Sequence, residues 1–166
     1  MLFRSSPPVA YADVGARTLR QLETFNFPQT VTSGTIVALA NLLPQRSQGD
    51  EIFSWYFTPY STSSFIEIEV MTNVVVAGTT AYIALFNDYQ TDAMAVYPMQ
   101  VGTSTFVIPV TFKHYYQPLQ AGVQTRFSLR SAAAATGLTF NYYAYGLKNS
   151  SRVTMKEWSA LGLQNV

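Results

Sequence analysis

Hydrophobic and polar residues alternate over several short stretches of this chain, with the two-residue period of a half-buried β-strand. The alternation is clearest at residues 65–70, where Ile66, Ile68 and Val70 fall on one face and two glutamates on the other. Residues 52–58 are rich in aromatic and β-branched side chains, which fit a pleated sheet. A proline and several serines separate the two stretches, so we expect a hairpin there that needs further strands as partners.

The same signals recur at regular spacing along the rest of the chain. Pro109 favours an edge strand or a bulge, and residues 113–118 and 132–135 are expected to be loops. About nine short strands with no helix of normal length between them are typical of an antiparallel sandwich or barrel. The sequence therefore predicts an all-β fold, an antiparallel jelly-roll-like β-sandwich of about 8–9 strands. Its further strands are expected at residues 35–39, 81–86, 93–97, 105–111, 123–130, 138–145 and 153–158.

The first thirty residues differ from the rest, and we expect an N-terminal extended arm over residues 1–30 ahead of a jelly-roll domain over residues 31–166. Pro7 and Pro8 favour an extended chain, and Asp13 is a candidate cap for a short helix. The alternative is a frayed terminus. Apolar side chains in the arm favour docking on another subunit over disorder. These interface candidates are Leu2, Phe3, Val9, Leu19, Leu22, Phe25 and Phe27.

Composition limits the classes of function. The chain has 166 residues, of which 48% are hydrophobic, enough for one sizeable core. Only 11% are charged and the net charge is +1, so no basic patch points to nucleic acid. Cysteine is absent, which removes disulfides and thiolate chemistry. The N-terminus lacks the apolar core of a signal peptide, and no apolar run is long enough to predict membrane insertion.

Candidate chemical groups are few. His114 is the only histidine and lacks the partners that metal sites and nucleophile pairs require. Glu67 and Glu69 share a strand face and can reach the spacing of an acid–base pair, but we favour a solvated edge because nothing marks a cleft. Asp88 and Asp92 flank an oxygen-rich loop without the spacing of a calcium loop. We expect no catalytic residue, no metal and no cofactor, and therefore no enzyme.

Aromatic residues near the chain's loops are better candidates for function. Exposed tyrosines can stack on sugars or pack against a neighbouring subunit, and the alternative for each is packing in the core. The apolar character of both faces of residues 52–57 also suggests burial beyond one sandwich core, which favours an oligomer. The candidates for contact with a sugar or with a neighbouring subunit are Tyr115, Tyr116, Tyr142, Tyr143 and Tyr145.

Several segments together resemble a known family. They are GDEIFSWYFTPYSTSSFIEIEV at residues 49–70, YIALFNDYQTDAMAV at 82–96, VTFKHYYQPLQAGVQTRFSLRS at 110–131 and SRVTMKEW at 151–158. In this order they resemble the trimeric jelly-roll knobs of bacteriophage tail-fibre tips and related virion appendages. The resemblance spans roughly residues 34–158 and implies a homotrimer with a structural or receptor-contact role in the virion, after synthesis in the host cytoplasm. It implies no catalysis.

The chain departs from that family in two places. Residues 142–146 are tyrosine-rich where the family often has a glycine-rich run, so a receptor loop is not carried over. Only about thirty residues precede the first expected strand, and at about 3.5 Å each they suit pinning to a capsid better than projecting a tip. We therefore expect a head-decorating or cement protein whose partners are copies of itself and the major capsid protein or another virion protein. The alternative is a tail-fibre tip or adhesin that binds a host surface glycan.

Overall fold

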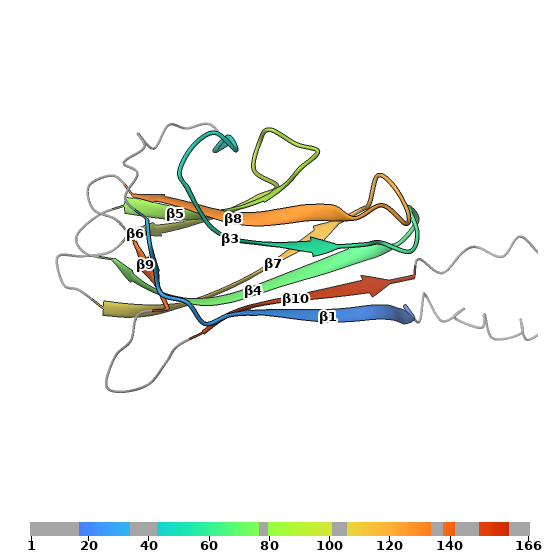
Figure 1. Cartoon of the computed structure of the whole chain (residues 1–166), viewed down its shortest axis with the longest axis horizontal. Coiled ribbons are helices and arrows are strands. Elements are labelled where there is room, and N and C mark those ends of the chain that lie inside the picture. The colour runs from blue at the N-terminus through green and yellow to red at the C-terminus, as the bar shows by residue number, and fades with distance from the viewer. Residues whose placement is uncertain are drawn as a thin grey trace, which may run out of the picture.

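The computed structural model describes residues 17–33, 43–76, 80–100, 106–133, 138–141 and 150–159. These residues form ten strands and no helix, so the predicted all-β class is confirmed (Figure 1). The strands are β1 (Leu19–Phe27), β2 (Val31–Thr32), β3 (Asp50–Phe57), β4 (Phe65–Val76), β5 (Thr80–Asn87), β6 (Ala95–Gln100), β7 (Phe106–Tyr116), β8 (Thr125–Ala133), β9 (Thr139–Phe140) and β10 (Ser151–Trp158).

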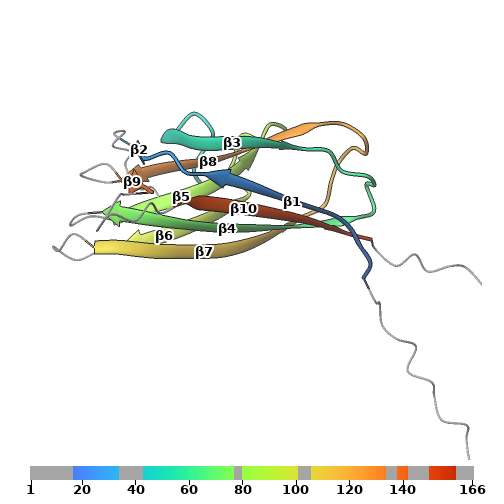
Figure 2. The same ribbon diagram turned by 60° about the horizontal axis from the view of Figure 1, so that its bottom comes forward.

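The strands form two antiparallel sheets that face each other as a sandwich (Figure 2). The first sheet, here called the β4 sheet, has the order β1-β10-β4-β9-β2, and β7 pairs with the other side of β4. The second, the β8 sheet, has the order β3-β8-β5-β6. The longer strands pair from the outside of the chain inwards: β1 with β10, β3 with β8, β4 with β7 and β5 with β6. Successive pairs alternate between the sheets, which is the wrapped arrangement of a jelly roll.

The expected hairpin over residues 49–70 is wrong in its pairing, although both of its strands exist. β3 pairs with β8 in one sheet, whereas β4 pairs with β10 and β7 in the other. The connecting residues cross from sheet to sheet, because each strand has an inner face to bury and stacked sheets lie only about 10 Å apart. The predicted inner face of β4 is confirmed, since Ile66, Ile68 and Val70 are fully buried.

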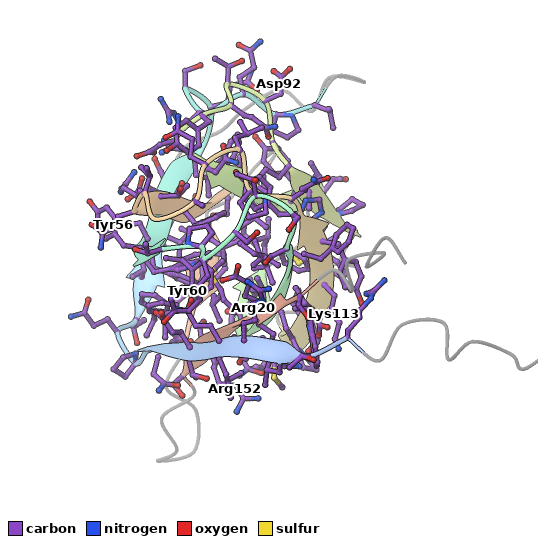
Figure 3. The ribbon with its side chains drawn as sticks, turned by 90° about the vertical axis from the view of Figure 1, so that its right-hand side faces the viewer. Arg20, Tyr56, Tyr60, Asp92, Lys113 and Arg152 are labelled. Carbon is purple, nitrogen blue, oxygen red and sulfur yellow. The ribbon has the colours of Figure 1, made fainter. Side chains whose placement is uncertain are left out.

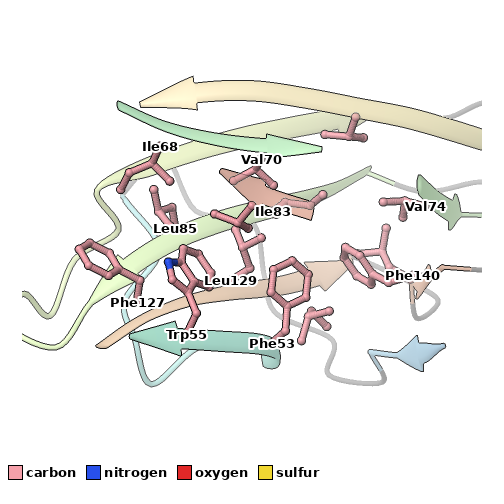
Figure 4. Packing of buried hydrophobic residues seen from close by; sticks show 14 of the residues in the cluster. Phe53, Trp55, Ile68, Val70, Val74, Ile83, Leu85, Phe127, Leu129 and Phe140 are labelled. Atoms are coloured by element: carbon pink, nitrogen blue, oxygen red, sulfur yellow. The ribbon is translucent and has the colours of Figure 1, made fainter. Parts of the chain in front are cut away.

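Aromatic and aliphatic side chains together fill the space between the sheets (Figure 4). Trp55 of β3 stacks on Phe127 of β8, with ring centroids 6.0 Å apart and planes inclined by 15°. Its indole Nε1 lies 2.9 Å from the Sδ of Met155 on β10, so Trp55 contacts both sheets. Side chains of this size dominate the energetics of a core, so Trp55 holds the two layers together.

The short helix expected after Asp13 is not present in the described residues that follow, from residue 17 onwards. Residues 19–27 form β1, an edge strand that pairs with β10 along its length. Phe25 and Phe27 alternate with polar residues and pack against the core, and Phe27 stacks on Phe53 at 4.0 Å between centroids. Without β1, one edge of β10 would have no partner strand among the described residues. This edge and the two-residue alternation favour a strand over a helix, so residues 19–27 belong to the sandwich. Residues 1–16, with Leu2, Phe3 and Val9, lie outside the described residues.

Other boundaries also shift. Residues 113–116 were expected as a loop but extend β7, because they pair with β4 as far as Tyr116. Pro109 lies in β7, which pairs only with β4 among the described strands, so its predicted edge position is confirmed. β6 continues past Pro98, again at a sheet edge, and residues 132–133 extend β8. The strand expected at 138–145 is described only over β9, and the one expected at 35–39 lies outside the described residues.

Candidate functional site

The structure separates the tyrosines that the sequence grouped. Tyr115 and Tyr116 are neighbours on β7 and point to opposite faces of the sheet. Tyr116 is buried, with its ring edge-on to Phe127 at 5.8 Å between centroids, so the alternative of core packing holds for it. Tyr115 is 57% exposed on the outer face. Tyr142, Tyr143 and Tyr145 lie outside the described residues.

The interface candidates on β1 also divide into core-facing and exposed side chains. Phe25 and Phe27 face the core, whereas Leu19 and Leu22 are exposed, Leu22 at 56%. Leu22 lies opposite Lys156 of β10 in the ladder and therefore on the outer face of the β4 sheet. Of the described arm candidates, the leucines are the ones available to a partner.

An apolar patch lies on the outer face of the β4 sheet, at the end where β1 begins. We call it the outer aromatic patch, and it consists of Leu22, Phe65, Tyr115 and Trp158. Phe65 lies directly opposite Trp158, and Tyr115 lies opposite the residue two positions beyond Phe65, so neighbouring strands bring these side chains to one face. The guanidinium of Arg17 lies over the Phe65 ring at 5.4 Å. Sequence analysis missed Phe65 and Trp158, although Phe65 begins the 65–70 alternation and shares the face of Glu67 and Glu69.

Charged residues border the patch on the same face. Lys113 lies 3.1 Å and Lys156 3.2 Å from a carboxylate oxygen of Glu67, and both lie within 4 Å of Glu69. Burial by itself raises the pKa of Glu67, but hydrogen bonds and charge from both lysines outweigh it and hold this pKa below its usual range. The glutamates thus form an ion-pair ladder on a central strand, not the solvated edge that we expected. A carboxyl held ionised in this way does not serve as a general acid.

A second ion-pair network lies on the other sheet. Asp88, after β5, pairs with Arg46 at 3.1 Å and with Arg126 at 3.7 Å. Arg126 and Arg130 of β8 both pair with Glu51 of β3. The negative charge of Asp88 is therefore balanced by Arg46 and Arg126. No cluster of three or more histidine, cysteine, aspartate or glutamate residues suited to a metal occurs in the described part of the chain.

Figure 3 views the sandwich from the end that carries the patch. Arg152 projects from the outer side of the β4 sheet, and Lys113 and Tyr56 lie on opposite sides of the sandwich. The side chains of Arg152, Lys113 and Tyr56 therefore point away from one another. Within the described residues, no helix has the length and apolar character needed to cross a membrane.

We predict that acid destabilises the protein in separate steps that belong to different residues. His114 lies opposite the buried Ile68, on the inner face of β7, and burial lowers the pKa of its imidazole. The unfolded chain takes up this proton first, so the free energy of unfolding falls as the pH drops below about 6.5, by at most about 1.4 kcal/mol per pH unit. Glu67, with its lowered pKa, adds a further loss below about pH 4.3.

Urea unfolding across this pH range checks the assignment. His114→Gln should flatten the step below neutral pH, and Glu67→Gln should reduce the step at lower pH. An unchanged slope near pH 6 in the His114 variant would contradict the role given to that residue.

Comparisons with known proteins place the chain near no established family. No family model and no curated protein matches it. Among solved structures it is similar to dimeric latent PorU from Porphyromonas gingivalis, with 12% identity, a TM-score of 0.40, and coverage of 91% of this chain and 14% of that one. It is also similar to the VP2 subviral particle of infectious bursal disease virus, with 10% identity, a TM-score of 0.35, and coverage of 83% and 39%. The chain spans well under half the length of either protein, and likenesses this weak carry no functional argument.

Proposed function

We propose that the protein is a bacteriophage virion structural protein, a jelly-roll module that decorates or cements the capsid surface as a homotrimer. In this proposal it binds other copies of itself and the major capsid protein or another virion protein, and it carries out no catalysis. The observation that carries the proposal is the outer aromatic patch. The fold alone is not a sufficient reason, because one fold hosts many functions.

The patch has the composition of a protein–protein interface. Phe65 and Tyr115 are exposed on one flat sheet face, next to the charged ladder of Glu67 with Lys113 and Lys156. Interfaces commonly combine an apolar aromatic centre with a polar rim, and exposed apolar patches on soluble proteins mark contact sites. The phage assignment and the trimer come from the sequence resemblance. The patch supports only the coarser proposal that the chain binds other protein chains.

Association of the chain should depend on this patch. We expect Tyr115→Arg and Phe65→Arg to weaken self-association by about tenfold or more, because a charge then enters the apolar centre of the contact. Tyr89→Arg is the matched control, since Tyr89 is also exposed but lies in the turn after β5. Sedimentation equilibrium of the full chain measures the effect. Equal association in all three variants would remove the patch from the interface.

Purified phage particles test the placement. A capsid decoration protein should co-purify with heads that lack tails and should appear on the capsid surface in a reconstruction. Recovery only with tails, together with specific binding on a glycan array, would favour the alternative of an adhesin. That alternative draws on the same patch, because the rings of Phe65, Tyr115 and Trp158 are also suited to stacking on sugars.

A further inference from the structure

One side of the sandwich is bordered by two edge strands that belong to different sheets. Among the described strands, β1 pairs only with β10 and β3 pairs only with β8. Between them lies a cleft of about 490 Å³, lined by residues 24–27 and 54–56. It continues into a second cleft of about 170 Å³, which Asn26 and Phe27 also line. We call the two together the edge groove.

The groove has an aromatic floor and polar walls. Trp55 and Phe25 lie 6.2 Å apart between ring centroids, and Phe27 stacks on Phe53 further along. Polar side chains of β1 and β3 stand beside these rings, among them Thr24. On the opposite side of the sandwich, the stacked rings of Tyr97 and Phe112, 5.8 Å apart between centroids, bridge β6 and β7.

Such a groove suits an extended peptide. An edge strand presents a row of backbone N–H and C=O groups that a further strand can pair with. Added strands gain affinity from these main-chain hydrogen bonds and specificity from pockets that take alternate side chains. β1 offers an edge of nine residues beside the aromatic floor.

We infer that the edge groove binds residues 1–16 of a second copy of this chain. This segment carries only two charged side chains, Arg4 and Asp13, and Pro7 and Pro8 favour an extended conformation. In an extended segment Val9 and Tyr11 share one face, and Ala10 and Ala12 lie on the opposite face, so residues 9–12 carry no charged side chain on either face.

The occupant is assigned to a second copy because of the direction from which the chain enters β1. The guanidinium of Arg17 lies over Phe65, on β4, which lies beyond β10 and away from β3. The N–H of Thr18 donates to the hydroxyl of Ser159 at 3.2 Å, and the N–H of Ser159 donates to the carbonyl oxygen of Thr18 at 2.9 Å, so the two segments stay side by side past the end of β1. To reach its own groove, the segment would have to reverse and cross the edge of its own sheet. Sixteen extended residues reach about 55 Å, enough to contact a neighbouring copy.

Disulfide trapping between differently labelled chains tests this assignment, and the natural chain contains no cysteine to interfere. Full-length Val9→Cys is mixed with full-length Thr24→Cys and oxidised mildly. We expect a mixed disulfide dimer, at a yield about tenfold or more above that from mixing Val9→Cys with Thr111→Cys, because docking raises the local thiol concentration. Thr111 is the matched control, an exposed threonine on β7 at the other side of the same sheet.

The outcomes separate clearly. A Thr24-selective mixed dimer supports the inference. No mixed dimer, or equal yields with both threonine variants, overturns it. A disulfide that forms only within one chain carrying both Val9→Cys and Thr24→Cys also overturns it, because the segment would then occupy its own groove.

The inference rests on the proposed role in an assembly, but the two can fail separately. Sedimentation of the Tyr115 and Phe65 variants and co-purification with particles report on the proposed function. Disulfide trapping reports only on the groove. Association and particle binding without the Thr24 crosslink would leave the proposed function standing and remove the groove as the docking site.

Discussion

Replacing Asn141 with alanine should lower the free energy of unfolding by about 3 kcal/mol, measured by urea denaturation. Asn141 is buried, and its backbone has φ of 54°, in the left-handed region that asparagine tolerates better than alanine does. The substitution also removes the side-chain amide that bonds to groups of Phe27, Gln29 and Ser151, and a buried polar group costs about 1–3 kcal/mol when left without a partner.

The amide of Asn141 connects segments that lie far apart in the sequence. Its Nδ2 donates to the carbonyl oxygens of Phe27 at 2.6 Å and Gln29 at 2.8 Å, and so fixes the corner after β1. Its Oδ1 accepts from the hydroxyl of Ser151 at 2.7 Å. Because Ser151 has one hydroxyl proton, the 2.6 Å contact with Thr72 must be a bond that Thr72 donates. β1, β4 and β10 are therefore joined through one residue.

Two further substitutions separate the backbone contribution from that of the amide. Asn141→Gly relieves the φ cost and should recover about 1 kcal/mol of the loss. Asn141→Asp keeps the shape but turns a carboxylate oxygen toward the two carbonyl oxygens, so it should destabilise about as much as alanine. Asn26→Ala, at an exposed asparagine on β1, serves as the control with little expected effect. A loss in Asn141→Ala no greater than in Asn26→Ala would contradict the role of the amide.

Replacing Glu157 with alanine should cost about 3 kcal/mol and should open the loop between β3 and β4. Glu157 is fully buried near the end of β10. Its Oε1 accepts from the backbone N–H groups of Tyr60 at 3.0 Å and Ser61 at 3.1 Å, and its Oε2 accepts from Tyr60 at 2.9 Å. Hydrogen bonds to a charged group contribute about 1.5–3 kcal/mol each, and the alanine variant leaves both donors without this acceptor.

The effect should extend beyond this loop. The carbonyl oxygen of Pro59 accepts from the N–H of Gly122 at 2.7 Å, which ties the β3–β4 loop to the β7–β8 loop. Amide hydrogen exchange should therefore accelerate at Tyr60, Ser61 and Gly122 in Glu157→Ala. Glu157→Gln keeps one acceptor oxygen and should show a smaller loss.

A half-exposed glutamate on β1 provides the control for Glu157. Glu23→Ala should cost clearly less than Glu157→Ala, since Glu23 accepts a partly buried hydrogen bond from Gln21 on the same strand and does not anchor a loop. Unchanged exchange at Tyr60 and Ser61 in Glu157→Ala would contradict the proposed anchoring.

Local pattern was a reliable guide to strands and faces, but not to partners. The alternation at residues 65–70 placed the inner face of β4 correctly, because side-chain direction along a strand depends only on the two-residue period. The pairing of β3 with β4 was wrong, because nothing local distinguishes a tight hairpin from a connection that crosses between sheets. The loop expected at 113–118 was wrong over residues 113–116 for a similar reason, since pairing with β4 overrides the weak preference of these residues.

The outer aromatic patch shows the same division. The sequence contained its members, and the alternation put Phe65 on the face of the two glutamates. Only the ladder register brought Trp158 opposite Phe65 and Tyr115 beside them. The same folding buried Tyr116, one residue away, because adjacent residues of a strand face opposite sides.

The sequence by itself determined that this protein is an all-β sandwich and which side chains of its main strands enter the core. Those properties follow from residue type and period, which are local. The tertiary structure alone decided that β1 joins the sheet, that Asn141 and Glu157 fasten distant segments, and that two strand edges border an open groove. These properties depend on which strands meet, and that is settled by the joint burial of both inner faces rather than by any one segment.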